Sequence, residues 1–427
     1  MPLPPPIRPQ QGPPTLPRVP LEQIDVQNLS KEKIRELYRS GRLPTSESIV
    51  EEVFQRATKI GSTDIHFEPI EGELRIRLGH EGILKRLVSL PADVTESVMS
   101  ILKTRATLNQ FEKKKPQEGR FSGTYQGESY DFRLSLIPVL AGERAEIRLL
   151  RKDKNIARLE ELGFSRTALE RIQGLLRSPK GLILFTGPGG SGKTTSVFAA
   201  VNAIETPEKC IITVEDPVEY RLPYASQVQL PSDRSFNFAD ALRAILRQNP
   251  NVILIGEIRD AETGVVAAEA ALTGNLVLST MLSTDAIGVI PRLANLGIQP
   301  FWLASTMAGV VYQQLIRKIC PECKQEAKPK DEDLAIIMPW LQQGGEHFFC
   351  EGKGCQSCGG TGYQGRTVIS EVISISMQFR DLILQNASTL EMRTEATNCG
   401  FQSIRVDAAE RAAMGLTSVS EFVRVLG

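Results

Sequence analysis

Apolar residues follow two different spacings in the first part of the chain. At 46–61 and 92–108 they recur every three or four positions, as on one face of a helix. Elsewhere between 46 and 152 they alternate with polar residues, with glycines at the breaks, which is typical of β-strands. The expected strands lie at 64–69, 73–79, 83–88, 119–127, 128–138 and 144–150. The pattern therefore predicts a compact α+β domain from 46 to 152.

The pattern changes after a charged linker and a helix at 153–180. Short, purely apolar runs now alternate with helical stretches, and each run ends in polar residues. Such runs are typical of strands that are buried on both faces of a parallel sheet. The three clearest runs lie at 181–186, 210–215 and 251–255. We therefore expect an α/β domain at 181–427, in which helices wrap a parallel sheet.

Two parts of this second domain differ from the rest. The tract 320–365 is rich in glycine and cysteine and only weakly periodic, so we expect an insertion held by something other than a hydrophobic core. Residues 376–427 have the spacing of two or three amphipathic helices.

The N-terminus and the charge balance limit the possible partners. Residues 1–20 are rich in proline, which predicts a disordered tail, and 21–45 predicts a short helical segment. Because 50 basic and 50 acidic side chains cancel, the positive charge typical of a nucleic-acid-binding protein is missing, and we predict no nucleic-acid partner. The longest apolar tract, 264–282, contains Glu269, and no signal-peptide pattern opens the chain. We therefore expect a cytoplasmic protein that does not itself span a membrane.

One segment has the pattern of a phosphate-binding loop. The residues GPGGSGKT from Gly187 to Thr194 match G-x-x-x-x-G-K-[ST] between an expected strand and an expected helix. In such loops backbone N–H groups surround the β-phosphate, Lys193 would reach the β- and γ-phosphates, and the Thr194 hydroxyl would bind Mg²⁺. The alternative is a glycine-rich turn without a ligand. The predicted nucleotide-binding residues are Gly187, Pro188, Gly189, Gly190, Ser191, Gly192, Lys193, Thr194 and Thr195.

Acidic residues follow two of the buried-type strands. Glu257 comes shortly after the run at 252–255, and Glu215, Asp216 and Glu219 cluster after another run. Ligands of open α/β sheets lie at the carboxyl ends of the strands, so these acids could hold Mg²⁺ or orient the attacking water. The alternatives are a helix N-terminal acid for Glu257 and a solvated loop for the cluster.

Four of the seven cysteines have the spacing of a metal site, C-x₂-C-x₃₁-C-x₂-C. They are Cys320, Cys323, Cys355 and Cys358. Two knuckles of this kind bring four thiolates to one tetrahedral Zn²⁺, whereas redox pairs are the alternative. We expect Cys350 to be a bystander, and Cys210 and Cys399 to be small core residues.

In this order, the motifs resemble those of the secretion ATPases that drive type II secretion and type IV pilus assembly. The resemblance covers about 46–427, nearly the whole folded chain. STDIHFEP resembles the opening of that family's N-terminal domain, ITVEDPVEY its Asp box, and LRAILRQNPNVILIGEIRD the stretch around its Walker B strand. The resemblance implies an α/β fold: an N-terminal α+β, PAS-like domain, then a RecA-like P-loop ATPase domain with a zinc-knuckle insertion and C-terminal helices.

The resemblance also implies roles for individual residues. Glu257 would be the catalytic carboxylate, Glu215 and Glu219 would organise Mg²⁺ and water, and Arg133 and Arg148 would be presented to the phosphates. The implied cofactors are ATP, Mg²⁺ and Zn²⁺, and the implied partners are a homo-hexamer and an inner-membrane platform protein. We therefore predict a cytoplasmic hexameric ATPase, peripheral at the inner membrane, that couples ATP hydrolysis to assembly of a type IV pilus or a type II secretion pseudopilus.

One segment departs from the family. Relatives read roughly G-H-L-V-x-S-T-L-H-T-N-D-A where this chain has GNLVLSTMLSTDA at 274–286, so Asn275 and Leu282 replace two histidines. Gln314 stands where relatives usually carry arginine. If the histidines sense the γ-phosphate, hydrolysis would be weakened here. The alternative function is a nucleotide-binding structural or regulatory subunit.

Overall fold

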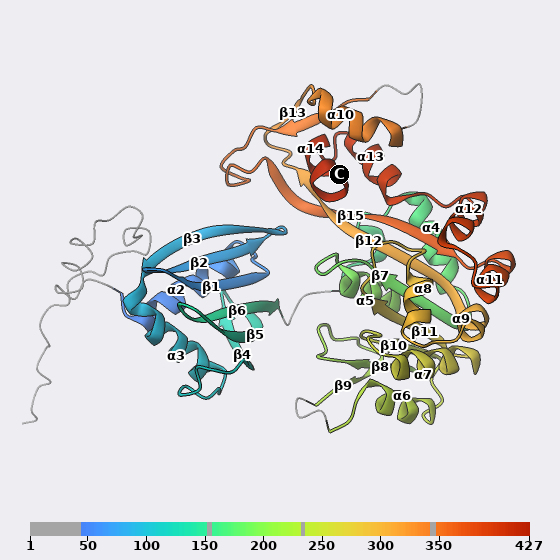
Figure 1. Ribbon diagram of the computed structural model, residues 1–427, viewed down its shortest axis with the longest axis horizontal. Helices are drawn as coiled ribbons and strands as arrows, with labels where there is room; N and C mark the ends of the chain where they lie inside the picture. The colour runs from blue at the N-terminus through green and yellow to red at the C-terminus, as the bar shows by residue number, and fades with distance from the viewer. Residues whose placement is uncertain (1–43, 152–155, 232–234, 342–346) are drawn as a thin grey trace, which may run out of the picture. The chain divides into compact units, whose positions relative to one another are not determined.

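The computed structural model describes residues 44–151, 156–231, 235–341 and 347–427. The predicted tail at 1–20 and nearly all of the predicted helical segment at 21–45 lie outside these ranges. The chain divides into two compact units, Met1–Lys154 and Asn155–Gly427 (Figure 1). The finer domain boundaries stay predictions.

The first unit is an antiparallel sheet whose core also includes two helices (Figure 1). The strand order is β3-β2-β1-β6-β5-β4. Phe54 of α2 meets Phe132 of β5 edge to face, with 4.8 Å between the ring centroids. The elements are α2 Ser46–Lys59, β1 Asp64–Ile70, β2 Glu73–His80, β3 Ile83–Pro91, η2 Ala92–Val94, α3 Thr95–Arg105, β4 Gln117–Tyr125, β5 Glu128–Val139 and β6 Gly142–Arg151.

All six predicted strands and both predicted helices of this unit are confirmed, but the second helix is shorter than expected. Its first three predicted residues form a 3₁₀ turn, and the α-helix begins at Thr95. It ends at Arg105 because Thr107 has a φ of 57°, which an α-helix cannot accommodate.

The second unit is built on a seven-stranded sheet of order β15-β12-β7-β11-β10-β8-β9 (Figure 1). Every neighbouring pair is parallel except β12 and β15. The predicted parallel sheet is therefore confirmed, with one antiparallel edge strand added. The strands are β7 Gly181–Thr186, β8 Ile211–Glu215, β9 Ala225–Gln229, β10 Val252–Ile255, β11 Leu276–Met281, β12 Met307–Ile319 and β15 Tyr363–Ser374.

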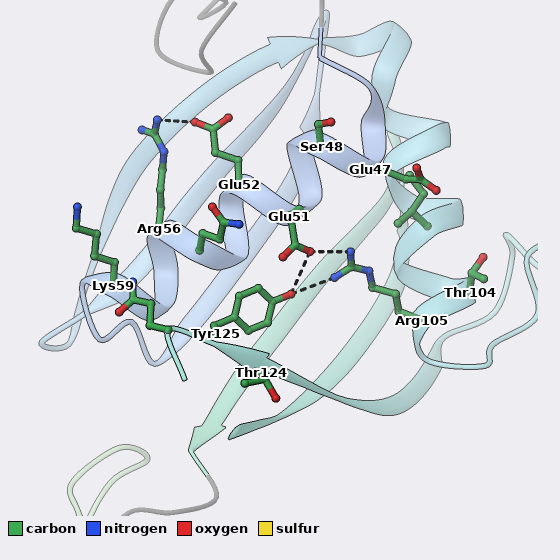
Figure 2. Close-up of a pocket in the computed structure, with 13 residues that line it drawn as sticks. Glu47, Ser48, Glu51, Glu52, Arg56, Lys59, Thr104, Arg105, Thr124 and Tyr125 are labelled. Atoms are coloured by element: carbon green, nitrogen blue, oxygen red, sulfur yellow. Dashed lines mark hydrogen bonds and ion pairs between the residues drawn. The ribbon is translucent and has the colours of Figure 1, made fainter. Parts of the chain in front are cut away.

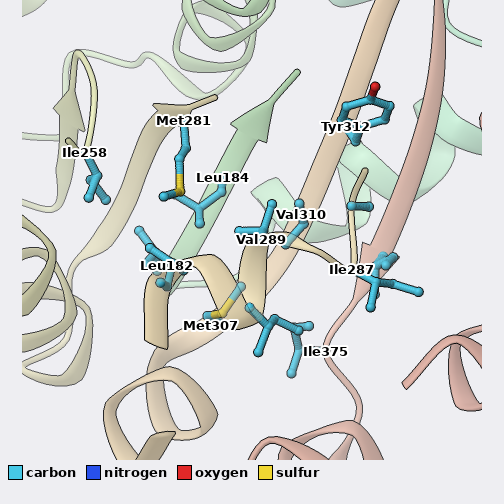
Figure 3. Packing of buried hydrophobic residues seen from close by; sticks show 14 of the residues in the cluster. Leu182, Leu184, Ile258, Met281, Ile287, Val289, Met307, Val310, Tyr312 and Ile375 are labelled. Atoms are coloured by element: carbon cyan, nitrogen blue, oxygen red, sulfur yellow. The ribbon is translucent and has the colours of Figure 1, made fainter. Parts of the chain in front are cut away.

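Alternate side chains of the central strands enter two different cores. On β7, Leu182 and Leu184 belong to one core, whereas Ile183 and Phe185 belong to the other. Figure 3 shows Leu182 and Leu184 with Met281 in the first of these cores. Because both faces are covered, these strands read as unbroken apolar runs. The helices up to 306 are η3 Leu159–Glu161, α4 Arg166–Leu176, α5 Lys193–Ile204, α6 Phe238–Leu246, α7 Ala261–Leu272, α8 Val289–Asn295 and α9 Pro300–Thr306.

The cysteine-rich tract is more ordered than predicted. It contains a two-stranded sheet, β13 Lys324–Glu326 with β14 Cys350–Gly352, and helix α10 Asp331–Ile337 followed by η4 Met338–Trp340. Ile337 and Leu341 are buried in the larger core. The expectation that the tract lacks core contacts is therefore wrong for its α10 segment, where apolar residues pack against α14.

The C-terminal region contains four helices, so the expectation of two or three is wrong. They are α11 Met377–Leu384, α12 Thr389–Asn398, α13 Ile404–Ala413 and α14 Val419–Leu426. Asn386, Gly400 and Gly415 each have a positive φ, which ends one helix and lets the next begin in a new direction. Among the described helices, none is long and apolar enough to cross a bilayer.

Glu421 fastens α14 to β12. Its carboxylate is fully buried and accepts hydrogen bonds from the backbone N of Arg317 at 2.9 Å, Arg317 Nη2 at 2.7 Å and Arg424 Nε at 2.6 Å. Burial alone would raise the pKa of Glu421, but the bonds from Arg424 and Arg317 outweigh burial and lower it.

We expect Glu421→Gln to destabilise the second unit by about 3 kcal/mol at pH 7, since it leaves buried positive charge uncompensated. The lowered pKa makes the Glu421 contribution complete above the usual carboxyl value of 4.5, and it is lost as the pH falls below this value. Urea unfolding at pH 7 and at pH 4 measures both effects. The difference between variant and parent should shrink at pH 4, while the exposed Glu269→Gln control should stay close to the parent at both pH values.

Candidate active site and metal centre

The parallel register brings the carboxyl ends of four strands to one edge of the sheet. Thr186 of β7 is level with Met281 of β11, and Ile255 of β10 is level with Ser279 of β11 and Val214 of β8. The loops that follow these strands therefore lie at the same edge, where ligands of open α/β sheets bind.

The glycine-rich loop joins β7 to α5 as the sequence predicts. Gly187 has a φ of 145° and Gly192 a φ of 85°, conformations that favour glycine at both ends of the loop. Lys193 Nζ donates to the backbone oxygens of Gly187 at 3.0 Å and Pro188 at 2.8 Å. Burial lowers the pKa of Lys193, and the negative charge of Glu257 partly offsets this effect. Lys193 and Glu257 therefore act on each other electrostatically.

The remaining predicted loop residues differ in their surroundings. Pro188, Gly189 and Gly190 are exposed, as a loop that binds a phosphate requires, whereas Ser191 is buried. The Thr195 hydroxyl lies 3.3 Å from the Tyr220 hydroxyl, so Thr195 points toward the loop after β8.

The acidic residues follow neighbouring strands, β10 and β8. Glu257 Oε2 accepts a hydrogen bond from Arg259 Nε at 2.9 Å. Glu215 is buried, and its Oε1 accepts from Thr213 Oγ1 at 2.5 Å and from Gln227 Nε2 at 3.1 Å. Burial raises the pKa of Glu215, the two hydrogen bonds partly offset this, and the charge of Glu219 adds to the rise. A nearby cation would remove the cost of keeping this carboxylate ionised.

The two positions that lack histidine lie at opposite ends of β11. Asn275 precedes the strand, and its Nδ2 donates to the backbone oxygen of Ala270 at 2.8 Å. Leu282 follows the strand, at the edge that carries the phosphate loop, and its side chain is 42% exposed. Within one subunit, only the replacement at Leu282 therefore lies where a histidine could contact a γ-phosphate at this edge. The position of Asn275, at the other end of β11, does not support the expectation that it replaces a second such contact.

The loop after Leu282 is fastened to the C-terminal helices. The backbone N of Ala286 donates to Glu371 Oε2 at 3.1 Å, and Glu371 Oε1 accepts from the backbone N of Ile404 at 3.1 Å. Asp285 forms an ion pair with Arg393 of α12 at 3.5 Å. A change in this loop would therefore reach α12 and α13 directly.

The predicted arginines Arg133 and Arg148 lie in the first unit, whereas the phosphate loop lies in the second unit. They are directly opposite each other on β5 and β6, and Arg120 of β4 is directly opposite Arg133. Arg148 Nε donates to Asp64 Oδ1 at 3.0 Å, and its side chain is 58% exposed. Three arginines thus form one row across the sheet, and Arg120 is not among the site residues that the sequence predicts. The two-residue turn at Gln126–Gly127 could have identified it. Tyr125 and Glu128 pair next to this turn, and the fifth pair beyond them is Arg120 with Arg133.

The four spaced cysteines converge at the end of the β12–β15 pair. The Sγ atoms of Cys320 and Cys355 lie 3.8 Å apart, those of Cys323 and Cys358 3.9 Å, and those of Cys355 and Cys358 3.7 Å. Four thiolates at about 2.3 Å from one Zn²⁺ in tetrahedral geometry are about 3.8 Å apart, so this arrangement fits a Cys₄ zinc site. The N–H groups of Cys355 and Gly362 donate to Cys358 Sγ and lower the pKa of Cys358 to about 6.

The other three cysteines take no part in this cluster. Cys350 begins β14 and is not among the four converging residues, as expected. Cys210 and Cys399 are exposed, so the expectation that they are core residues is wrong. Cys210 directly precedes β8 and Cys399 caps the C-terminus of α12, and such positions at the ends of elements are open to solvent.

The first unit also has an open groove of 1180 Å³ between α2, α3 and the turn after β4 (Figure 2). Four of its charged side chains are paired with each other. Arg105 donates to Glu51 Oε2 at 3.0 Å and to the Tyr125 hydroxyl at 3.2 Å, and Arg56 pairs with Glu52 at 2.6 Å (Figure 2). These two ion pairs satisfy Glu51, Glu52, Arg56 and Arg105 within the protein, so the four side chains do not by themselves specify a ligand.

A parallel sheet with a G-x-x-x-x-G-K-T loop at its carboxyl edge defines the class of P-loop α/β proteins. Within that class, the chain belongs to the family of type II/IV secretion system proteins, which it matches over residues 40–424.

Two relatives illustrate the range of the family. The chain is 38% identical to the type IV pilus assembly ATPase PilB of Thermus thermophilus over 377 residues, which cover 88% of this chain and 42% of that protein. It is 37% identical to the type II secretion system protein E of Pseudomonas aeruginosa over 377 residues, 88% of this chain and 74% of that protein. The chain thus spans less than half the length of the first relative.

Solved structures have the same fold. The ATPase DotB of Legionella pneumophila is similar with a TM-score of 0.65 at 20% identity, covering 90% of this chain and 96% of that one. The pilus retraction motor PilT, solved with bound ADP, is similar with a TM-score of 0.58 at 26% identity, covering 87% and 95%. The predicted fold class is therefore confirmed.

The buried Glu215 leads to a prediction about stability. Because burial raises its pKa, ionised Glu215 destabilises the fold at pH 7, and this cost disappears as the pH falls and the carboxyl group is protonated. Glu215→Gln keeps an acceptor for Thr213 and Gln227, so we expect it to stabilise the nucleotide-free protein by roughly 1 kcal/mol at pH 7. Thermal unfolding at pH 7 and pH 4.5 measures this, with the exposed Glu208→Gln as control. A lower melting temperature for Glu215→Gln at pH 7 would contradict it.

Proposed function

We propose that the chain is the ATPase core of a type IV pilus assembly or type II secretion machine, and that it hydrolyses ATP at the Gly187–Thr194 loop. One observation carries the proposal: the parallel register places the loop with Lys193, which follows β7, and Glu257, which follows β10, at the same edge of the sheet. Family membership and the names of the relatives support the reaction and the machinery.

The residues at this edge divide the work. The N–H groups of Gly189–Gly192 and the Lys193 ammonium would bind the phosphates, and the Thr194 hydroxyl would hold Mg²⁺. Glu257 accepts a proton from the attacking water and aligns it with the γ-phosphate. Bound Mg²⁺ would neutralise phosphate charge, and the buried Glu215 fits this ion because a cation offsets the cost of its ionised form.

The row of Arg120, Arg133 and Arg148 supports a ring, with a homo-hexamer as the assembly. Three arginines in one row on one face of the sheet could contact the phosphates of a nucleotide in a neighbouring subunit, since guanidinium groups form charge-assisted hydrogen bonds with phosphate. We infer that the ring works in the cytoplasm against an inner-membrane platform protein. The alternative function, a regulatory subunit with weak hydrolysis, is not favoured, since two relatives named as ATPases match 88% and 94% of this chain.

Two variants separate binding from chemistry. Lys193→Ala should weaken affinity for ATP and ADP, because the ammonium contacts phosphate before and during the reaction. Glu257→Gln should retain affinity and lose turnover by a factor of about 10² or more, because Glu257 is needed mainly for attack by water. Phosphate release and fluorescent-nucleotide titration of the same preparations measure both. Equal losses of affinity and turnover in the two variants would contradict this division of roles.

We propose further that the four-cysteine cluster holds one structural Zn²⁺. Elemental analysis of protein purified without chelator should give about one zinc per chain. Cys355→Ser should lose the metal and lower the melting temperature, because the knuckles have few apolar contacts of their own. Cys350→Ser is the matched control and should keep the full zinc content. A zinc content near zero in the parent protein would refute the proposal.

A further inference from the structure

The phosphate loop is fastened to a neighbouring strand that carries none of its sequence motif. Gln313 of β12 is fully buried, and its Nε2 donates to the backbone oxygen of Ser191 at 2.8 Å. The two residues are 122 positions apart in the sequence. The side chain of Gln313 therefore links β12 to the middle of the loop.

Gln313 also packs closely against the first and last glycines of the loop. A Cβ atom on Gly187 would lie 2.2 Å from the backbone oxygen of Gln313, and one on Gly192 would lie 3.2 Å from Gln313 Nε2. The contact follows from the strand register, since Tyr312 is level with Thr186, the last residue of β7. Gln313 is the next residue of β12, so it faces the point where the loop begins.

The side-chain amide of Gln313 is energetically unfavourable at this buried position, and this cost indicates what the amide contributes. Gln313 Oε1 is buried and has no hydrogen-bond partner among the described residues, so the amide is only half satisfied. A half-satisfied buried amide is unfavourable, and an apolar side chain of the same length would fill the space without that cost. What the amide supplies, and an apolar side chain cannot, is the donor for the Ser191 oxygen.

We infer that Gln313 is a positioning residue for the phosphate loop, holding it in the shape that receives the phosphates before nucleotide binds. This inference rests on the proposed function of the loop. The loop contains four glycines and would otherwise sample many conformations, and ordering it on binding would reduce affinity. Because a preformed loop contacts the phosphates in both the ground state and the transition state, Gln313 should act on KM rather than on kcat.

Gln313→Met removes the donor and nearly preserves the shape. In the full chain we expect KM for ATP and the dissociation constants of ATP and ADP to rise about 2- to 10-fold, the value of one hydrogen bond, with kcat within about twofold of the parent. Hydrogen exchange without nucleotide should show faster exchange at 189–193. Ser370→Ala is the matched control: Ser370 lies directly opposite Gln313 on β15, and its buried hydroxyl has no partner among the described residues. It should leave KM unchanged.

The outcomes separate a positioning role from mere structural support. General damage to the fold would reduce the active fraction, so kcat would fall and KM would stay constant, and that result would overturn the inference. Unchanged KM and unchanged affinity in Gln313→Met would also overturn it. If Gln313→Met does not fold, Gln313→Asn keeps the amide but withdraws it from Ser191, and the same rise in KM is expected. Loss of affinity in Lys193→Ala tests the proposed function separately, so the two ideas can fail independently.

Discussion

Parallel pairing of β7, β11, β10 and β8 is the constraint on which the rest of the second unit depends. Because the four strands run in the same direction and in register, their carboxyl ends lie at one edge of the sheet. The loops that follow the strands therefore begin at this edge. Lys193 and Glu257 come from strands that are not neighbours, since β11 lies between them. The sheet, and not local sequence, therefore brings the two charges together, and it does so with strands buried on both faces that have little freedom to shift.

The β12–β15 pair extends this sheet and joins three features that are distant in the sequence. On one face Gln313 holds the phosphate loop, and on the other Glu371 holds the loop after β11. Cys320 directly follows β12, so the four-cysteine cluster lies at the far end of the same pair. A metal that fixes this end would limit fraying of the two strands, and with it movement of the two loops that the strands support.

The sequence was sufficient for the parts of the site that rest on local patterns. The phosphate loop, Glu257 and the four cysteines each have a characteristic spacing or follow an apolar run, so neighbouring residues identify them. Gln313 has no such signal, because its partner is a backbone oxygen in a loop that lies 122 positions away in the sequence. The sequence predicts too few C-terminal helices for a related reason. Asn386 has a positive φ and separates α11 from α12, and no glycine at this point indicates the break between the two helices. Cys210 is exposed although cysteine is a residue type that is buried on average. Residue type does not indicate that this cysteine directly precedes a strand, where it is open to solvent.

The position of Leu282 limits how this chain can distinguish ATP from ADP. Leu282 stands at the edge between the phosphate loop and Glu257, yet its side chain has neither a donor nor an acceptor. The side chain at this position therefore cannot form a hydrogen bond with a γ-phosphate. The polar side chains next along the chain are turned to other partners: Ser283 Oγ donates to the backbone oxygen of Asp285 at 3.1 Å, and Asp285 Oδ1 accepts from the backbone N of Gly288 at 2.8 Å. Thr284, between these two residues, donates from its hydroxyl to Asp285 Oδ2 at 3.5 Å. Communication to the C-terminal helices would then pass through the main chain of the loop, from the end of β11 through Ala286 to Glu371, and not through a side chain that contacts the nucleotide.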